Sequence, residues 1–420
     1  MRRLRLDNWL TASSGKGRAP LWRWLALGAG VAMLVAGSYY LGHSQSPAGM
    51  SEESREGVEL YSEALNLVQK EYVDQEELDP DEQAHAAIEG MLGSLGDEGH
   101  TRLLTPEEAE RNEQSISGRY VGVGVTIEER EGEAVVSSPT DGSPADEAGI
   151  QSGDVILAVN GENVEDESLS RIAERVRGEE GTTVGLTLRR DGEEREFTLE
   201  RSEIDVSAAS WAMIPDTETA HLRLSTFSSE SADELEQALE EARRAGAQRY
   251  ILDLRDNSGG RLDQAVAAAE LFLEPDSVVY IRQDAEGDRE RIRTSDGSDP
   301  ARAPMTVLVN GGTASSAEIL AGALRDNGRA EVVGVSTFGT GTVLKPYELD
   351  DGSKLLLGIA EWLTPDGDFI REGGIEPSVR VELEEGREPL IPDEEDGLSR
   401  RQIMNRDAQL ERAFELVRQK

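Results

Sequence analysis

A strand, a tight turn and a helix are predicted without a gap across residues 305–324. Residues 305–310 are apolar and rich in β-branched side chains, which indicates a buried strand. Residues 311–316 are small (Gly-Gly-Thr-Ala-Ser-Ser), and an amphipathic segment follows them. Ser315 is therefore expected at a helix N-terminus, where unpaired N–H groups and the helix dipole stabilise developing negative charge. A serine there can act as a nucleophile, although a simple N-cap would show the same pattern.

Further motifs accompany this turn in a definite order along the chain. They are an apolar strand at residues 250–254, Gly259-Gly260, a helix predicted over residues 262–272, Gly339-Thr340-Gly341, and Gly373-Gly374-Ile375-Glu376-Pro377. In this order the motifs resemble those of the carboxy-terminal processing (tail-specific) serine proteases, over roughly residues 55–420. The resemblance implies an α/β multidomain protein with a crotonase-like βα protease core. It also implies cleavage of proteins near their C-termini through an acyl-enzyme at Ser315.

The resemblance implies an oxyanion hole beside this serine. Its donors would be the backbone N–H of Ser316 and that of Gly259 or Gly260. Glycine allows the backbone to approach a substrate carbonyl closely, which suits this task. The alternative is an ordinary strand-to-helix turn at Gly259-Gly260.

The chain departs from the family at the position of the general base. Members with a serine–lysine dyad carry Gly-Lys-Gly followed shortly by Gln, whereas this chain has Gly339-Thr340-Gly341 and then Leu344. Threonine cannot serve as a base. Lys345 is near, but alternation along a strand would place it on the face opposite Thr340 and Leu344. Either another base serves Ser315, or the chain is a catalytically inactive binding or scaffold protein.

Histidine offers a replacement base. The chain has four: His43 beside an apolar segment, His85 in a predicted helix, His221 on a predicted strand face, and His100 in a turn. The string Asp97-Glu98-Gly99-His100-Thr101 resembles the Asp-Gly-His-Thr turn of the histidine-using branch of the family. In that branch a late glutamate orients the histidine, and Glu372 matches it. The hypothesis is a Ser315–His100–Glu372 triad; the alternative is that His100 braces a turn and Glu372 is a solvated loop acid.

Residues 118–203 are interpreted as an inserted PDZ domain. Gly118-Arg119-Tyr120-Val121-Gly122-Val123-Gly124-Val125 resembles a PDZ carboxylate-binding loop, so Tyr120, Val121, Gly122, Val123, Gly124 and Val125 are the expected peptide-binding residues. The string Gly153-Asp154-Val155-Ile156-Leu157-Ala158-Val159-Asn160-Gly161 resembles the PDZ modules of bacterial proteases, and Asp191-Gly192 predicts a hairpin turn. A PDZ domain captures a chain end by β-addition and holds its carboxylate on backbone N–H groups.

Composition limits the partners. The net charge is −41, from 84 acidic and 43 basic residues, which argues against nucleic acid and suits a salt-rich environment. An acidic surface repels acidic tails, so proteins with hydrophobic C-termini are the expected substrates. Cysteine is absent, which excludes disulfides. The sequence contains no zinc-site spacing, phosphate-binding loop or haem motif, so neither a metal nor a cofactor is expected.

The N-terminus departs from this acidic pattern. Six basic residues and one acid precede residue 25, and residues 21–42 are almost uncharged and apolar, with Trp and Tyr at both ends. This predicts a basic cytoplasmic segment (1–20) and a single-pass membrane anchor (21–42) that leaves the catalytic part outside the cytoplasm. A cleaved signal peptide is the alternative.

The remaining organisation follows from pattern. We expect a linker (43–54), an N-terminal helical segment (55–117), the PDZ domain, the protease core (204–385), and an acidic linker with a C-terminal helix (386–420). A stripe of Val58, Tyr61, Leu65, Val68 and Tyr72 has helical spacing and predicts core packing, and residues 408–417 predict a helix that docks as core.

Overall fold

The computed structural model describes residues 51–75, 78–96, 100–130, 132–140, 142–165, 167–297, 300–371, 373–384 and 386–419. The chain divides into two compact units, with the boundary between Gln83 and Ala84. The expected membrane anchor at residues 21–42 lies outside the described residues. Within the part of the chain that is described, no helix is both long and apolar enough to cross a membrane.

The first unit contributes one long helix, α2 (Glu52–Glu71). Its start is capped by Ser51, whose side chain accepts the N–H of Ser54. None of its residues is buried, and Val58 and Tyr61 expose 49% and 42% of their surface. The prediction that this stripe packs as core is therefore wrong for α2, since helical spacing creates an apolar face but supplies no partner to cover it.

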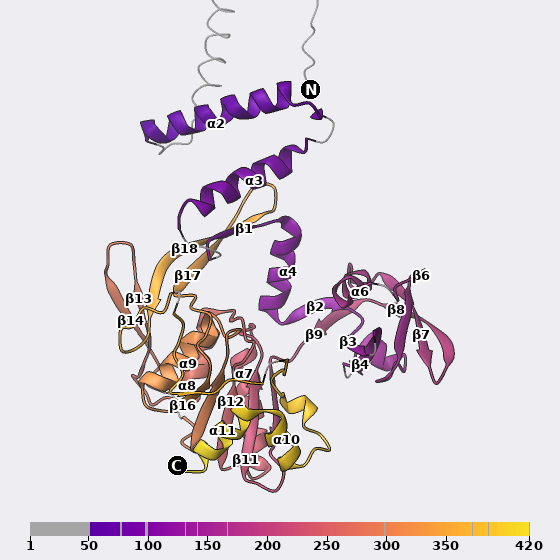
Figure 1. Ribbon diagram of the computed structural model, residues 1–420, viewed down its shortest axis with the longest axis vertical. Helices are drawn as coiled ribbons and strands as arrows, with labels where there is room; N and C mark the ends of the chain where they lie inside the picture. Colours follow the sequence, from indigo (N-terminus) through magenta and orange to yellow (C-terminus); the bar gives the residue numbers. More distant parts are fainter. Residues whose placement is uncertain are drawn as a thin grey trace, which may run out of the picture. The chain divides into compact units, whose positions relative to one another are not determined.

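The centre of the second unit is a six-stranded sheet, largely parallel (Figure 1). In spatial order its strands are β10 (Ala209–Met213), β11 (Thr219–Leu224), β12 (Arg249–Asp253), β15 (Met305–Val309), β16 (Glu331–Gly334) and β19 (Val379–Arg380). Only β10 runs antiparallel to its neighbour. The strands predicted before Gly259-Gly260 and before Ser315 are β12 and β15, which pair directly. Adjacent parallel strands end at the same sheet edge, so the two turns meet there.

Helices cover both faces of this sheet, as the alternation of its side chains requires. Tyr250 and Leu252 of β12 belong to the core formed with α7 (Ser231–Arg244), α8 (Leu262–Glu270) and α9 (Ser316–Asp326). Ile251, between them, packs instead with α10 (Arg400–Arg406) and α11 (Ala408–Val417). The expected C-terminal helix is thus confirmed, with Leu410, Ala413, Phe414 and Val417 buried.

A second sheet holds the segment that follows His100. Its strands are β1 (Arg102–Leu104), β13 (Val278–Gln283), β14 (Arg289–Arg293), β17 (Thr342–Glu348) and β18 (Lys354–Leu363). Both β1 and β17 pair with β18. After β1 the chain enters α4 (Pro106–Ser117). At its start, Thr105 and Glu108 exchange side-chain and backbone hydrogen bonds as a capping box. Helix α3 (Pro80–Gly93) precedes β1 along the chain.

The segment interpreted as a PDZ domain has its own sheet and core. Its strands are β3 (Val125–Arg130), β4 (Glu133–Pro139), β5 (Val155–Val159), β6 (Glu162–Asn163), β7 (Thr183–Arg190) and β8 (Glu193–Glu200), with helices α5 (Pro144–Glu147) and α6 (Leu169–Val176). Asp191 and Gly192 both have positive φ, as the predicted hairpin turn requires. The chain enters and leaves the domain through a two-stranded pair, β2 (Arg119–Gly122) with β9 (Ser202–Asp205).

Candidate active site

Ser315 occupies the turn that the sequence predicted, directly before α9. The residue is half-buried and has φ +53° and ψ −120°, a conformation that non-glycine residues seldom adopt. Local strain of this kind persists only where the surroundings hold it, and it is common at functional sites. A nucleophile on a sharp strand-to-helix turn presents its hydroxyl at the edge of the sheet.

Glu318 holds this turn in place. Its carboxylate is fully buried and accepts the N–H of Ser315 at 2.8 Å and the N–H of Thr340 at 2.9 Å. The other oxygen accepts the N–H of Gly339 at 2.7 Å and the hydroxyl of Thr337. The carboxylate therefore joins the serine turn to the loop at residues 337–340. This role of Glu318 is not among the predictions from the sequence, although Ser-x-x-Glu at a helix start is a capping pattern that indicates it.

The turn after β12 lies against Ser315, as the resemblance implied. A Cβ added to Gly259 would lie 2.7 Å from the Ser315 Cβ, and the Ser316 hydroxyl donates to the Gly260 carbonyl at 3.0 Å. The Gly259 N–H donates to Oδ1 of Asn257 at 2.9 Å. Within the described ranges, the N–H groups of Gly260 and Ser316 have no acceptor. These two N–H groups are therefore free hydrogen-bond donors beside Ser315.

Thr340 stands where dyad members of the family carry lysine. It is nearly fully buried, and its Oγ1 accepts the Ser315 N–H at 3.1 Å. Lys345 is exposed, and its ammonium lies 5.0 Å from the centre of the Tyr347 ring. Neither side chain offers Ser315 a basic nitrogen.

His100 lies in a turn that leads into β1 and contacts the same loop. Its ring centre is 6.1 Å from that of Phe338, in an edge-to-face arrangement. Phe338 is 62% exposed, and its N–H donates to the carbonyl of Thr313 at 2.9 Å. Phe338 thus meets His100 through its ring and the serine turn through its backbone N–H. No direct hydrogen bond joins His100 to Ser315 among the residues that the structure describes.

Glu372 lies outside the described residues, but Arg371 before it and Gly374 after it both contact residues 337–342. Arg371 donates to the Thr342 hydroxyl at 2.9 Å. Gly374 has φ +68°, and a Cβ there would lie 2.2 Å from the Thr337 carbonyl oxygen, so only glycine fits. The late glycine turn thus packs on the loop that Glu318 ties to Ser315.

The PDZ domain contains a cavity of about 370 Å³ between the start of β3 and α6. Four of the six expected peptide-binding residues line it: Tyr120, Val123, Gly124 and Val125. The other two, Val121 and Gly122, lie in β2 and pair with Glu203 and Ser202 of β9. Ile127, Ala173 and Val176 give the cavity apolar walls. Such a groove suits an apolar chain end that adds to the exposed edge of β3.

Tyr120 and Arg177 form the polar edge of this cavity. Burial raises the pKa of the Tyr120 phenol above its ordinary value. The Arg177 guanidinium lies 5.2 Å from the centre of the Tyr120 ring, a cation–π contact.

The two remaining described histidines contact acidic residues that lie far from them in the sequence. His85 of α3 lies 2.8 Å from Oδ2 of Asp351, in the turn between β17 and β18. The Ser353 hydroxyl and then His85 hold the pKa of Asp351 below its usual range. His221 lies in β11, fully buried between two carboxylates. Neither partner could be inferred from the local sequence.

Similarity to known proteins agrees with this site. Residues 218–381 match peptidase family S41, and residues 135–190 match the PDZ domain family. The carboxy-terminal processing protease CtpA of Bacillus subtilis (strain 168) is 34% identical over 351 residues, which cover 83% of this chain and 73% of the relative. A CtpA-like serine protease of Staphylococcus haemolyticus is 32% identical over 376 residues, which cover 88% of this chain and 75% of the relative.

A solved structure, the photosystem II D1 C-terminal processing protease, is 28% identical, with 79% of this chain and 94% of that chain covered and a TM-score of 0.45. The identity to curated relatives extends over most of both chains. The chain therefore belongs to the carboxy-terminal processing serine proteases of peptidase family S41, and it is a serine-type peptidase with a PDZ domain.

Proposed function

We propose that this protease is a membrane-anchored endopeptidase whose nucleophile, Ser315, is served by His100 rather than by a lysine. The observation that carries the proposal is the strained Ser315 turn, which Glu318 holds beside the free N–H groups of Gly260 and Ser316. A turn of this shape has no structural need for a serine. It suits a hydroxyl that must reach a substrate carbonyl.

The proposed reaction has two steps. The Ser315 Oγ attacks the scissile carbonyl carbon while His100 takes its proton, and the N–H groups of Gly260 and Ser316 stabilise the oxyanion. His100 then protonates the leaving amine as the C–N bond breaks, which leaves an acyl-enzyme. Water attacks this ester, again giving a proton to His100, and the proton returns to Ser315. Glu372 would orient the imidazole. Because the Gly259 N–H is already bonded to Asn257, Gly260 is the better second donor.

The base is assigned by the chemistry of the available side chains. Thr340 takes the place of the lysine, and its Oγ1 accepts the Ser315 N–H. Lys345 is exposed on Tyr347. His100 contacts Phe338 of the loop around the serine turn, and an imidazole exchanges protons near neutral pH. Catalytic hydrogen bonds are often long before substrate binds, so closure of the His100 turn on Ser315 would complete the site.

The substrates proposed are proteins with hydrophobic C-termini. The apolar walls of the PDZ cavity, together with the strongly acidic chain, favour an uncharged or apolar tail. We further propose that residues 21–42 anchor the chain in the membrane with the catalytic part outside the cytoplasm, because basic residues precede this apolar segment and acidic ones follow it. Membrane fractionation, with protease treatment of intact cells, tests that location.

The deciding experiment compares wild type with Ser315→Ala. A denatured protein with a hydrophobic C-terminus should be cleaved by wild type alone, while both proteins bind its tail. A serine-directed fluorophosphonate should label wild type and not the variant. If wild type takes no label and cleaves nothing at low or high salt, the chain is instead a catalytically inactive binding protein.

A further inference from the structure

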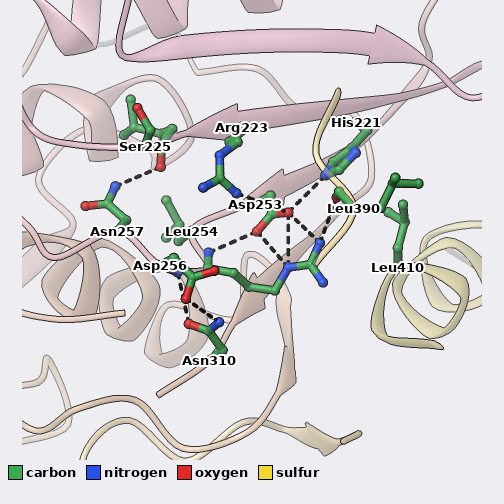
Figure 2. A network of polar contacts seen from close by, with 12 residues as sticks. His221, Arg223, Ser225, Asp253, Leu254, Asp256, Asn257, Asn310, Leu390 and Leu410 are labelled. Carbon is green, nitrogen blue, oxygen red and sulfur yellow. Dashed lines mark hydrogen bonds and ion pairs between the residues drawn. The ribbon is translucent and has the colours of Figure 1, made fainter. Parts of the chain in front are cut away.

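His221 belongs to a buried polar network around Asp253 that the sequence did not reveal (Figure 2). Its Nδ1 lies 2.7 Å from Oε1 of Glu395, and its Nε2 lies 3.2 Å from Oδ2 of Asp253. Both carboxylates are buried. A neutral imidazole has only one N–H, so two carboxylate partners call for the doubly protonated ring.

The charges around His221 balance only in that protonated state. Asp253 also accepts from Arg255, which in turn donates to Asp407 at 2.7 Å, and Arg223 lies 4.0 Å from Asp253. Three cations thus face three carboxylates: His221, Arg223 and Arg255 against Asp253, Glu395 and Asp407. Loss of the histidine proton leaves an uncompensated negative charge in a buried site, which is strongly unfavourable.

In the described part of the chain, the Glu395 carboxylate has one hydrogen-bond partner, His221. Among the described residues, its second oxygen, Oε2, is buried without a hydrogen-bond partner. Burial by itself lowers the pKa of His221, but the hydrogen bonds and charges of Asp253 and Glu395 outweigh burial and raise it above its ordinary value of 6.5. The contact between His221 and Glu395 is therefore strong at neutral pH and weakens as the solution becomes alkaline.

The network joins the C-terminal segment to the oxyanion turn. Glu395 follows the short helix η2 (Pro392–Glu394), and Asp407 caps α11. Asp253 ends β12, and its Oδ1 accepts the Arg255 N–H at 2.9 Å, which shapes the start of the turn.

Asn257 continues this path towards Ser315, and Figure 2 shows it near the same strand ends. Its carbonyl accepts the Ala314 N–H at 2.9 Å, and its Oδ1 accepts the Gly259 N–H at 2.9 Å. Hydrogen bonds thus lead from Glu395 through His221 and Asp253 to Arg255, the backbone leads on to Asn257, and Asn257 binds the residues beside the free Gly260 N–H.

We propose that His221 and Glu395 form a proton-dependent clasp through which the C-terminal segment positions the Gly260 turn beside Ser315. With the proton present, the clasp is closed and the oxyanion donors are aligned. Without it, the single remaining N–H of His221 cannot serve both carboxylates, so the Glu395 segment is held less firmly and the Gly260 turn loosens. His221 is thus a positioning residue, and the catalytic part of this inference rests on the proposed function.

Glu395→Gln tests the effect of the His221 proton separately from the effect of the contact itself. The amide can donate to Nδ1 of a neutral His221, while Nε2–H still donates to Asp253, so both hydrogen bonds survive deprotonation. Glu394→Gln, on the exposed neighbouring residue, makes the same change of charge without touching His221. In wild type and Glu394→Gln, kcat should fall tenfold per pH unit on the alkaline side, while KM stays constant. The total fall should reach about 10²-fold, which is the effect of losing one oxyanion donor. Glu395→Gln should lack this fall.

Hydrogen exchange of residues 250–260 and 390–417, corrected for the intrinsic effect of pH, gives a readout that needs no activity. Protection lost at alkaline pH in wild type and Glu394→Gln but kept in Glu395→Gln supports the clasp. If the same result appears without any cleavage, only the proposed function fails. Equal pH dependence in all three proteins overturns the clasp.

His221→Gln is the complementary variant. Both N–H bonds of its amide start from one nitrogen, whereas His221 reaches Glu395 and Asp253 from two different ring nitrogens. The variant should show the alkaline pattern of exchange already at neutral pH. Wild-type protection in this variant would also overturn the inference.

Discussion

The Glu318 carboxylate binds the backbone N–H of Ser315 at 2.8 Å and thereby ties a strained turn to a loop more than twenty residues further along the chain. A buried carboxylate that accepts several N–H groups is well compensated, and it leaves its donors little freedom. The strain at Ser315, with φ +53°, is thus maintained from outside the turn.

Glu318→Gln should therefore impair catalysis without removing the nucleophile. An amide has one acceptor oxygen and would direct its NH₂ at backbone donors, so the Ser315 turn shifts. A misplacement of this order costs about 10²-fold in kcat. Steady-state kinetics and the rate of fluorophosphonate labelling measure the loss, and Glu236→Gln on the exposed face of α7 is the control. Unchanged kcat would show that the turn does not need the carboxylate.

His100→Ala should reduce turnover by about 10⁴-fold or more, since members of a triad act as a unit. Thr340→Ala should cost less than about tenfold, because Glu318 still accepts the Ser315 N–H when the Thr340 hydroxyl is gone. Lys345→Ala should have no effect, since its ammonium lies on Tyr347. Full activity of His100→Ala would eliminate the triad.

Gly260→Ala should disrupt the oxyanion turn. A Cβ there would lie 2.4 Å from the Phe227 carbonyl oxygen, and φ is +138°, so the backbone must move. Displacing one oxyanion donor costs about 10²- to 10³-fold in kcat. Gly311→Ala serves as the matched control, because nothing lies within 4 Å of the added methyl group. Equal kcat in the two variants would show that Gly260 does not contribute to the oxyanion hole.

Substrates with a free C-terminal carboxylate should be cleaved more efficiently than the same substrates with an amidated C-terminus. The cavity formed by Tyr120, Val123, Gly124 and Val125 opens at a strand edge where a chain end can add. If a captured tail also moves the PDZ domain into a competent arrangement, amidation of the tail lowers kcat as well as raising KM. The test uses one peptide sequence in its acid and amide forms. Identical kinetic constants for both forms would show that the PDZ domain does not read the carboxylate.

Stability should fall on the alkaline side because of His221. The pKa of this histidine is raised in the folded protein, so its contribution is complete below its ordinary value of 6.5 and is lost as pH rises through the folded value. The free energy of unfolding in urea should therefore decrease with pH more steeply in wild type than in Glu395→Gln. Parallel curves would show that the His221 proton does not stabilise the fold.

Much of the local structure could be read from the sequence. The turn at Ser315, the Asp191-Gly192 hairpin and helix α11 each depend on residues within four or five positions of one another. Glycine and β-branched residues restrict the backbone there, so the pattern alone was sufficient. The apolar stripe of α2 shows the limit of the same reasoning, because periodicity specified a face and not what covers it.

What joins these elements was decided by the tertiary structure. Glu318 finds Thr337, Gly339 and Thr340 only because that loop returns to the start of α9. His221 and Glu395 are 174 residues apart, and only the order of strands and the docking of the C-terminal segment bring them together. A buried charge must find its partners within a few ångströms, whatever their separation in sequence. Local propensity carries no record of such pairings, whereas sheet topology determines them.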